Sequence, residues 1–334
     1  MDGMTHHLAG PSLQAVPTTH RTLKTAISCV GVGLHSGNRA NLTLRPAHPG
    51  TGIVFRRTDL GLDIPARFDH VIDTRLCTVI GLPGRPQVRV GTVEHLMAAF
   101  AGAGITDVRV EIDGAELPIL DGSADGFCFL IDCAGIAEYA APVHFIEVLR
   151  TVRVAHGDAF AELRPANPSA GLGLEAAVSI AFDAAAIGRQ AMSLRLTPSS
   201  FRADVARART FTLMSEIAAL RANGLALGGS LDNAVVVEGA KILNPAGLRM
   251  ADEFVRHKML DAIGDLALSG APMHARLIAH RTGHALNNRL LRALFAEDTN
   301  WRLADATALS QPGGTISHPA AWQPQHLAAA ARQA

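Results

Sequence analysis

The most informative stretch of the sequence is Glu253-Phe-Val-Arg-His257-Lys-Met-Leu-Asp261-Ala-Ile-Gly-Asp265. Its polar residues Glu253, His257, Asp261 and Asp265 recur at every fourth position. Because residues four apart lie one above the other on a helix, the pattern predicts a helix with an imidazole and carboxylates along one face. Such a face is either a surface ladder of ion pairs or part of a site. A histidine four residues before an aspartate allows both side chains to reach one metal ion.

This stretch has a counterpart in the first half of the chain. Val93-Glu-His95-Leu-Met97 matches Val255-Arg-His257-Lys-Met259, and the same offset superposes Gly102 on Gly264. Each match is followed by a strand-like run and then by a second helical pattern: strands over 108–112 and 275–279, helices over 124–133 and 285–295. The repeat suggests that the two histidines enter one cleft from opposite sides.

A second echo supports the repeat. Leu44-Arg-Pro-Ala-His-Pro-Gly-Thr-Gly52 resembles Leu163-Arg-Pro-Ala-Asn-Pro-Ser-Ala-Gly171, and both segments follow alternating, strand-like sequence. Chance similarity in a chain rich in alanine and glycine is the alternative, but two matches in the same order favour an internal duplication. A length of 334 residues also favours two domains.

The predicted fold class is α+β, with two similar domains from an internal duplication. Each domain is expected to be a β-sheet packed on α-helices, with the active site at the domain interface. Ile136 to Val143 would join the domains, and a βαβ-like insertion is expected near residues 206–240. The expected divisions are a flexible leader over 1–20, a first α+β domain over 21–140, a second over 141–300 and a variable tail over 301–334.

Composition excludes several classes of protein. Lys+Arg and Asp+Glu both number 30, which argues against a nucleic-acid binder that relies on a basic surface. The four cysteines form no Cys-x-x-Cys pair, so a disulfide framework or a cysteine zinc site is not expected and a reducing cytoplasm fits. The first twenty residues lack the parts of a secretory signal, and no run of 18 apolar residues occurs. We expect a cytoplasmic protein without a transmembrane segment; peripheral contact with a membrane stays open.

Two imidazoles and one carboxylate are a usual protein set for zinc, with the fourth position left to water. His95, His257 and Asp261 make such a set. Zinc lowers the pKa of a bound water from about 15.7 to near 7. Glu94, next to His95, is the candidate general base, and His284 is the candidate proton donor for the leaving group.

Further polar residues complete a candidate hydrolytic site. Asp265 would hold the imidazole of His284 and favour its charged form, against the effect of a helix N-terminus. Lys258 and the hydroxyl of Thr210 could stabilise developing negative charge. Taken singly, each of these residues has an ordinary role as the alternative, and Thr210-Phe211 alone reads as part of a strand. The joint pattern is stronger because the repeat places both histidines at equivalent positions.

Two features receive no chemical role from the pattern. Glu253 is expected to be solvated near the start of its helix. Gly224-Leu-Ala-Leu-Gly-Gly-Ser230 could cradle a phosphate, but a tight turn is favoured because the Gly-Lys-Ser/Thr ending of a nucleotide loop is absent.

Six motifs together resemble one known family. They are Gly31-Val-Gly-Leu-His-Ser-Gly37, Thr92-Val-Glu-His-Leu96, Pro118-Ile-Leu-Asp-Gly-Ser-Ala124, Arg207-Ala-Arg-Thr-Phe211, the segment 252–265 and Gly283-His-Ala-Leu-Asn-Asn288. The family is the zinc-dependent UDP-3-O-acyl-N-acetylglucosamine deacetylase (LpxC) family of lipid A biosynthesis in Gram-negative bacteria. The resemblance runs from about Arg21 to about Phe295 in unbroken order.

The resemblance implies hydrolysis of the N-acetyl amide of UDP-3-O-[(3R)-3-hydroxyacyl]-N-acetylglucosamine, which releases acetate in the committed step toward lipid A. It implies a two-domain fold with the site between the domains. The implied cofactor is Zn²⁺, with Fe²⁺ as the alternative metal. The implied partner is the UDP-linked acylated amino sugar rather than nucleic acid, and we expect a monomer. A hydrolase for another N-acyl sugar and a duplicated binding module without chemistry are the competing hypotheses.

The same resemblance assigns roles to residues. It makes His95, His257 and Asp261 the zinc ligands, Glu94 the general base, and His284 the general acid with Asp265 as its partner; Thr210 and Lys258 would contact the substrate or the oxyanion, and Phe211 would pack on the substrate. The insertion would help to form an apolar passage for the acyl chain, with Ile217, Leu220, Leu225 and Leu227 as candidate lining residues or as ordinary packing. Many relatives have a cysteine where this chain has Ala226.

Overall fold

The computed structural model describes residues 16–310, apart from residues 168 and 170. Its first half contains a five-stranded sheet in the order β2-β3-β9-β4-β5. The strands are β2 (Ile27–Val32), β3 (Arg39–Pro46), β9 (Val108–Ile112), β4 (Ile53–Arg57) and β5 (Leu62–Pro65). β4 runs parallel to β9, and the other neighbours are antiparallel. Alternate residues of β3 are buried, as a strand with one face on a core requires.

The second half repeats this arrangement. Its central strands follow the order β12-β13-β19-β14-β15, again with one parallel pair, β14 with β19, and antiparallel neighbours elsewhere. The strands are β12 (Val152–His156), β13 (Ala159–Arg164), β19 (Met273–His280), β14 (Leu174–Ala181) and β15 (Arg189–Arg195). Two further strands, β11 (His144–Val148) and β20 (Trp301–Asp305), extend this sheet to seven. The two halves therefore share strand order and strand direction.

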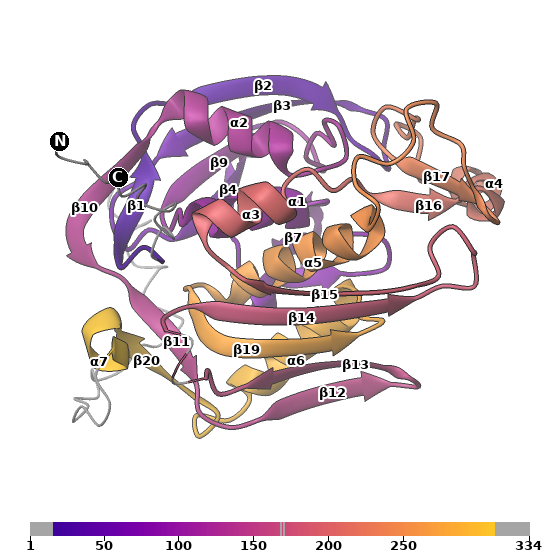
Figure 1. The fold of residues 1–334 in the computed structure, drawn as a ribbon. Coiled ribbons are helices and arrows are strands. Elements are labelled where there is room, and N and C mark those ends of the chain that lie inside the picture. Colours follow the sequence, from indigo (N-terminus) through magenta and orange to yellow (C-terminus); the bar gives the residue numbers. More distant parts are fainter. Residues whose placement is uncertain (1–15, 168, 170, 311–334) are drawn as a thin grey trace, which may run out of the picture.

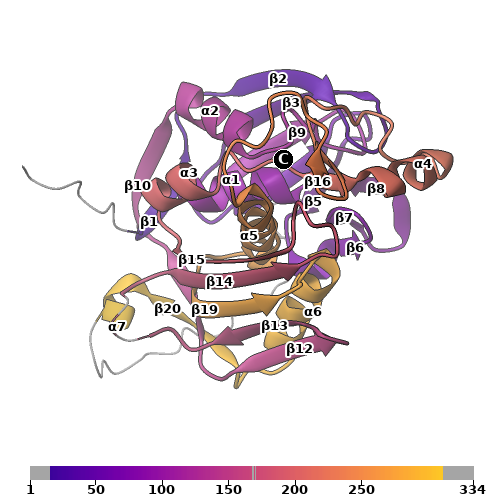
Figure 2. The ribbon, with the colours of Figure 1, turned by 45° about the vertical axis from the view of Figure 1, so that its right-hand side comes forward.

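Helices fill the space between the two sheets. α1 (Glu94–Ala103) and α2 (Asp125–Ala134) belong to the first half, and α5 (Glu253–Leu266) and α6 (His284–Phe295) to the second. α1 packs against α5 at the centre of the molecule, with strands of the first half above and β14 and β19 below (Figures 1 and 2). Both helices are buried along most of their length. The confirmed α+β class thus takes the form of two sheets that enclose paired helices.

A glycine permits the close approach of the two central helices. A Cβ atom added at Gly264 would lie 2.0 Å from the carbonyl oxygen of Glu94, which is a backbone atom that cannot move aside cheaply. At the matching position of the first half, a Cβ added to Gly102 would lie 2.1 Å from the ring of Phe201. Close packing, rather than backbone conformation, therefore requires glycine at both positions. The missing side chain at Gly264 allows Glu94 and His95 to lie next to α5.

Smaller elements connect and extend the halves. They are β1 (Thr19–Leu23), β10 (Ile136–Pro142), β6 (Val71–Asp73), β7 (Val79–Leu82), β8 (Arg85–Val90), α3 (Pro198–Asp204), β16 (Phe211–Leu213), α4 (Met214–Ala222), β17 (Val235–Glu238), β18 (Lys241–Ile242), α7 (Ala306–Ser310) and two 3₁₀ turns at Phe68–His70 and Ala267–Ser269. β6, β7 and β8 form one small sheet, and β16, β17 and β18 form another. β16 and β17 are parallel with α4 between them, so residues 206–240 contain a βαβ unit.

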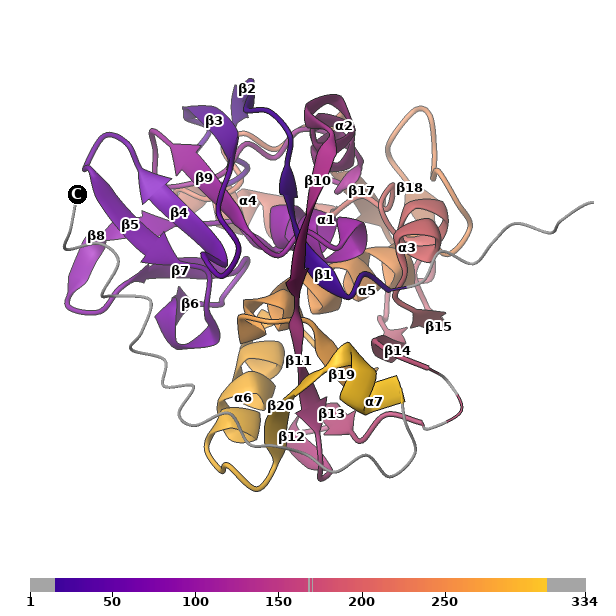
Figure 3. The same ribbon diagram turned by 90° about the vertical axis from the view of Figure 1, so that its left-hand side faces the viewer.

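Two boundaries differ from the sequence-based prediction, those of the leader and of the tail. The leader was expected to end at residue 20, but β1 begins at Thr19 and pairs with β10. The segment expected to join the domains is that strand β10, which leads directly into β11 of the second half (Figure 3). The variable tail was expected from residue 301, but Trp301–Asp305 is strand β20, antiparallel to β11. The partners of β1 and β20 lie far away in sequence, so no local pattern marks these strands. Residues 1–15 and 311–334 lie outside the described part of the chain.

None of the helices in the described residues is long and apolar enough to cross a membrane.

Candidate metal centre and active site

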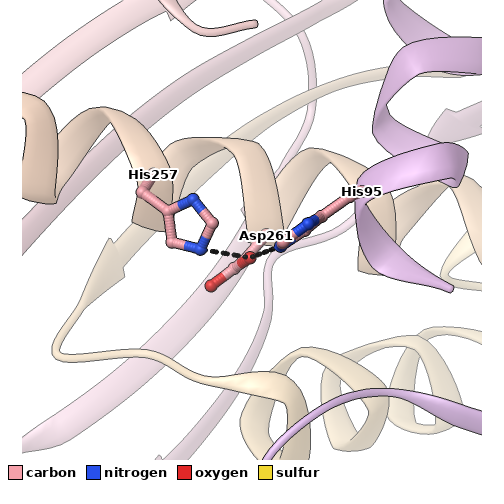
Figure 4. Close-up of side chains that lie close together, drawn as sticks. All are labelled: His95, His257 and Asp261. Carbon is pink, nitrogen blue, oxygen red and sulfur yellow. Dashed lines mark ion pairs between the residues drawn. The ribbon is translucent and has the colours of Figure 1, made fainter. Parts of the chain in front are cut away.

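Three side chains from the two central helices converge on one point. His95 lies in the first turn of α1, and His257 and Asp261 lie one turn apart on α5 (Figure 4). One ligand atom from each residue lies within 4.8 Å of the other two. Asp261 Oδ1 is 3.3 Å from His257 Nε2 and 3.7 Å from His95 Nε2. All three residues are buried, so the group is an interior cluster rather than a surface ladder of ion pairs.

The protonation and orientation of these groups suit a cation. His257 Nδ1 donates to the carbonyl of Ala208 at 3.0 Å, which leaves Nε2 as the ligand atom. Burial lowers the pKa of His257, and burial together with His257 lowers the pKa of His95 to about 3, so both rings are neutral at pH 7. Burial raises the pKa of Asp261, but His257 and Lys258 outweigh it and keep that pKa well below its usual range.

One buried oxygen in this cluster lacks a protein partner. Asp261 Oδ1 is buried and accepts no hydrogen bond from any described residue. Leaving a buried carboxylate oxygen unpaired is unfavourable, and a metal ion at the centre of the cluster would satisfy it. Two neutral imidazoles and an ionised carboxylate are also a donor set that suits zinc. The residues present therefore fit a divalent metal ion.

Glu94 and His284 face each other beside this cluster. Glu94 is the first residue of α1 and His284 the first of α6, and Glu94 Oε1 lies 3.7 Å from His284 Nε2. Burial, and to a lesser extent the carboxylates of Asp265 and Asp261, raise the pKa of Glu94 to about 7 against the effect of His284. Burial lowers the pKa of His284, but Asp265 and Glu94 outweigh it and raise that pKa to about 9. At neutral pH the imidazole is therefore protonated while the carboxyl can accept a proton.

Asp265 organises the groups behind this pair. Its Oδ2 accepts hydrogen bonds from His284 Nδ1 at 2.9 Å and from Asn287 Nδ2 at 2.8 Å. Its Oδ1 accepts from the hydroxyl of Thr78 at 2.5 Å, and the backbone N–H of Thr78 donates to Glu94 Oε2 at 3.0 Å. Thr78 thus links the carboxylates on α1 and α5, and it fixes the position of both.

Of the remaining predicted residues, Lys258 and Phe211 lie beside the cluster. Lys258 Nζ donates to Asp261 Oδ2 at 2.8 Å, and although burial lowers the pKa of Lys258, Asp261 outweighs it and raises that pKa. The ring of Phe211 lies 6.2 Å from that of His257 and 5.8 Å from Lys258 Nζ. Thr210 is half-buried, and its backbone carbonyl accepts from Val235. The structure thus brings Lys258 and Phe211 next to the cluster, whereas no described contact joins the side chain of Thr210 to it.

The prediction for Glu253 was wrong. This residue is fully buried, and its Oε1 accepts a hydrogen bond from Arg209 Nε at 2.8 Å. Its Oε2 accepts from Arg209 Nη2 at 3.1 Å and from the backbone N–H of Arg249 at 2.7 Å. The ion pair fastens the start of α5 to the segment that carries Ala208 and Thr210. The expected periodicity was right, but the partner lies 44 residues away and no local pattern shows it.

Sequence reasoning also missed three residues near the centre. Thr78 carries no local signal, because its partner Asp265 is 187 residues away. Asn287 and His35 lie in motifs that were recognised, but neither received a role. Both ring nitrogens of His35 are buried without a hydrogen-bond partner in the described chain. Burial lowers its pKa, Glu116 raises it and His284 lowers it, so His35 belongs to the surroundings of the site.

Two site helices are preceded by a left-handed residue that is not glycine. Thr92, two positions before Glu94, has φ 57°, and Arg281, three positions before His284, has φ 50°. This conformation is unfavourable for a β-branched residue such as threonine, with a typical cost of about 1–3 kcal/mol. The Thr92 hydroxyl donates to Glu116 Oε1 at 3.2 Å and holds the turn. Such strain is often found where a structure must aim side chains into a site.

Comparisons with known proteins agree with this geometry. The family model for UDP-3-O-acyl N-acetylglycosamine deacetylase matches residues 20–296. A protein of Idiomarina loihiensis is 50% identical over 283 residues, which cover 84% of this chain and 91% of that protein. A protein of Myxococcus xanthus is 48% identical, with 86% and 89% covered, and one of Acidithiobacillus ferrooxidans is 48% identical, with 85% and 92% covered. All three bear the name UDP-3-O-acyl-N-acetylglucosamine deacetylase.

Proposed function

Because the chain belongs to the UDP-3-O-acyl-N-acetylglucosamine deacetylase (LpxC) family, we propose that it hydrolyses the N-acetyl group of UDP-3-O-[(3R)-3-hydroxyacyl]-N-acetylglucosamine. The products are the free amine and acetate, and the reaction is the committed step of lipid A biosynthesis. The observation that carries the proposal is the convergence of His95, His257 and Asp261 beside the facing pair Glu94 and His284. A binding module without chemistry has no need of this base and acid.

We propose Zn²⁺ as the ion held by His95, His257 and Asp261, with Fe²⁺ as the alternative. When bound, the metal supplies Lewis-acid polarisation of the substrate carbonyl and of the attacking water. The neutral imidazoles and the unpaired Asp261 oxygen support this assignment. Metal ligands must be deprotonated to bind, and these three groups are deprotonated at pH 7.

The proton transfers belong to Glu94 and His284. Glu94, in its ionised form, takes a proton from the attacking water. His284, protonated and held by Asp265 through Nδ1, gives the proton on Nε2 to the departing amine nitrogen. Asp265 keeps the imidazole in the orientation in which Nε2 points at the reacting groups, because its oxygen fixes Nδ1 as a donor.

Charge and shape at the rim support binding of the substrate. The ammonium of Lys258 and the hydroxyl of Thr210 would stabilise the negative charge that develops on the carbonyl oxygen. Phe211 offers an apolar ring beside them for the substrate to pack against. The proximity of Lys258 and Phe211 to the cluster and membership in the family support these proposed roles.

The insertion supports a passage for the acyl chain. α4 has no buried residue, so Ile217 and Leu220 keep apolar surface exposed, and Leu227 in the following loop is 54% exposed. Apolar side chains that remain uncovered on a small subdomain suit an alkyl chain. We propose that these residues and Leu225 line the passage.

We also propose that the enzyme acts in the cytoplasm as a monomer, with at most peripheral contact with the membrane. All four cysteines are free thiols, as a reducing compartment allows.

Metal depletion and reconstitution test the function. The purified chain should contain about one zinc or iron per molecule and should release acetate from the UDP-linked substrate. Chelation should abolish turnover, and Zn²⁺ or Fe²⁺ should restore it. A chain that carries no metal and gains no activity from either ion would refute the proposal. Turnover of a series of substrates with different acyl lengths would then show which chain length the proposed passage accepts.

A further inference from the structure

A cavity of about 320 Å³ lies at the end of the helix pair opposite the metal cluster. Its walls come from both halves of the molecule and include Ala101, Ile105, Leu174, Ile263, Leu266 and Met273. Ile263 follows the metal-ligand position Asp261 by only two residues, but the lining contains none of the residues of the metal cluster or of the acid-base pair. It is therefore separate from the site described above. Its volume falls at the small end of the range for ligand pockets in proteins, about 300–1,000 Å³.

One polar pair in the wall is unused by the proposed chemistry. His20 Nδ1 lies 2.6 Å from Asp107 Oδ2, and Asp107 is fully buried. The Thr106 hydroxyl and the Gly52 N–H also donate to this carboxylate, at 2.6 and 2.9 Å. The carboxylate thus receives three hydrogen bonds and fixes the imidazole through Nδ1. Among the described residues, no hydrogen bond is found to the other ring nitrogen, Nε2, and we take this atom as the contact for a ligand.

The other hydroxyls of the wall are already engaged. Ser269 donates to the carbonyl of Ala271 at 2.8 Å, and Thr197 caps helix α3. His144 is a second basic group at the wall and is exposed. A ligand for this cavity should therefore be mostly aliphatic, with a single polar group that meets His20.

We propose that this cavity binds a medium-chain carboxylic acid, with its alkyl chain among the aliphatic walls and its carboxyl group on His20 Nε2. An imidazole and a carboxyl group form a hydrogen bond whichever of the two carries the proton, so a carboxylic acid suits this anchor better than a neutral amphiphile. The alkyl chain gains from burial in proportion to its length.

Occupation of the cavity ties the two halves together. Ala101 of α1 lines the cavity from the first half, and Ile263 and Leu266 of α5 line it from the second half. A ligand that contacts both helices binds the assembled structure and not the unfolded chain. It therefore stabilises the arrangement that holds His95 against His257.

Calorimetric titration of the full-length, metal-loaded protein with decanoate tests the proposal. We expect saturable binding, a rise in Tm of about 2–5 °C at a hundred-fold excess over Kd, and affinity that falls about fourfold for each methylene removed through octanoate to hexanoate. Two variants locate the ligand: Ala271→Leu fills the cavity, and His20→Phe removes the anchor. Each should weaken binding at least about ten-fold.

Ala219→Leu is the matched control, because it makes the same change at an exposed position of α4, beside the residues of the proposed acyl passage. It should leave the cavity's affinity for decanoate unchanged. Absence of decanoate binding, or binding that Ala271→Leu leaves intact, would overturn the proposal. Ala271→Leu keeps the His20–Asp107 pair. It therefore tests whether decanoate occupies the cavity even if His20→Phe disturbs folding. The titration needs no turnover, so a chain without deacetylase activity could still confirm the cavity site, and an active deacetylase could still fail this test.

Discussion

The two halves of the molecule share strand order, strand direction and helix placement, yet they contribute unequally to the candidate site. α1 supplies Glu94 and His95 from its first turn and is otherwise apolar. α5 supplies His257, Lys258, Asp261 and Asp265 along its length, and α6 begins with His284. At the corresponding start of α2 stands Asp125, which no described contact links to the cluster. The repeated fold thus places two equivalent helices face to face, but most of the candidate site residues lie in the second half.

The largest effect should come from Asp261→Ala, which removes from α5 the ligand that faces both histidines. We expect metal affinity to fall by more than the 10–100-fold that is typical of changes in outer-shell partners, and turnover to fall with it. Metal content after dialysis measures the loss. Asp252→Ala, which removes a carboxylate at the start of the same helix, is the control. Unchanged metal content in Asp261→Ala would remove this residue from the ligand set.

Next in size is His284→Ala, which tests whether the second half supplies the acid as well as the ligands. Turnover should fall by about 10²–10⁴-fold while metal stays bound, because the imidazole donates a proton and holds no metal. Steady-state kinetics together with metal analysis measure both properties. His280→Ala on the neighbouring strand should change neither. Loss of metal from His284→Ala would make this residue a ligand instead.

Glu94→Gln tests the contribution of the first half. In the parent enzyme, kcat/KM should rise as Glu94 loses its proton, at or below pH 7, and should fall as His284 loses its proton, at or below pH 9, because a bound dication lowers both pKa values. Glu94→Gln should remove the acidic limb and lower kcat/KM by about 10²–10⁴-fold. It should also move the alkaline limb to lower pH, because the Glu94 carboxylate raises the pKa of His284. An acidic limb that persists unchanged would exclude Glu94 as the base. Glu111→Gln, at a surface ion pair, is the control.

Glu253→Gln tests the ion pair that fastens α5 in place. The substitution keeps the shape but leaves the buried charge of Arg209 unpaired, so the free energy of unfolding should fall by about 3–5 kcal/mol. Asp252→Asn breaks a more exposed ion pair with Arg256 on the same helix. This substitution should lower the free energy of unfolding by about 1 kcal/mol or less. Denaturant unfolding of both variants measures the difference. If both variants lose the same small amount of unfolding free energy, the Glu253–Arg209 pair does not stabilise the start of α5.

The matched glycines give the smallest effect and the sharpest comparison of the halves. Gly264→Ala would press on the Glu94 carbonyl, whereas Gly102→Ala would press on the Phe201 ring. Each should lower stability by about 1–3 kcal/mol, as overpacking of a core typically does. Only Gly264→Ala should also lower turnover, because it displaces the start of α1. Thermal unfolding and kcat of both variants check this, and equal kcat values would show that the helix contact does not position Glu94.

Much of the fold and of the site follows from local pattern. The period of the segment 253–265 predicts α5 to within one residue of its end, and the motif match between 93–97 and 255–259 predicts that His95 and His257 approach each other. The alternating runs at 108–112 and 275–279 predict the central strands β9 and β19. The local hydrophobic period determines the helix and the strands, because it depends only on neighbouring residues, whereas the approach of the two histidines was inferred from the internal repeat.

Other features needed the tertiary structure. β20 pairs with β11 from more than 150 residues away, and neither strand carries a signal that predicts the other. Glu253 has the same spacing as its neighbours on the helix, yet its side chain turns to Arg209 rather than to solvent.

The sequence by itself indicated the four central helices, the pairing of His95 with His257 and the family. Only the tertiary structure decided that Thr78 bridges Glu94 and Asp265, that Glu253 is buried, and that a cavity with the His20–Asp107 pair lies at the far end of α5. The physical reason is that burial, pKa shifts and long-range hydrogen bonds depend on which distant segments pack together, and the local period of a chain does not contain that information.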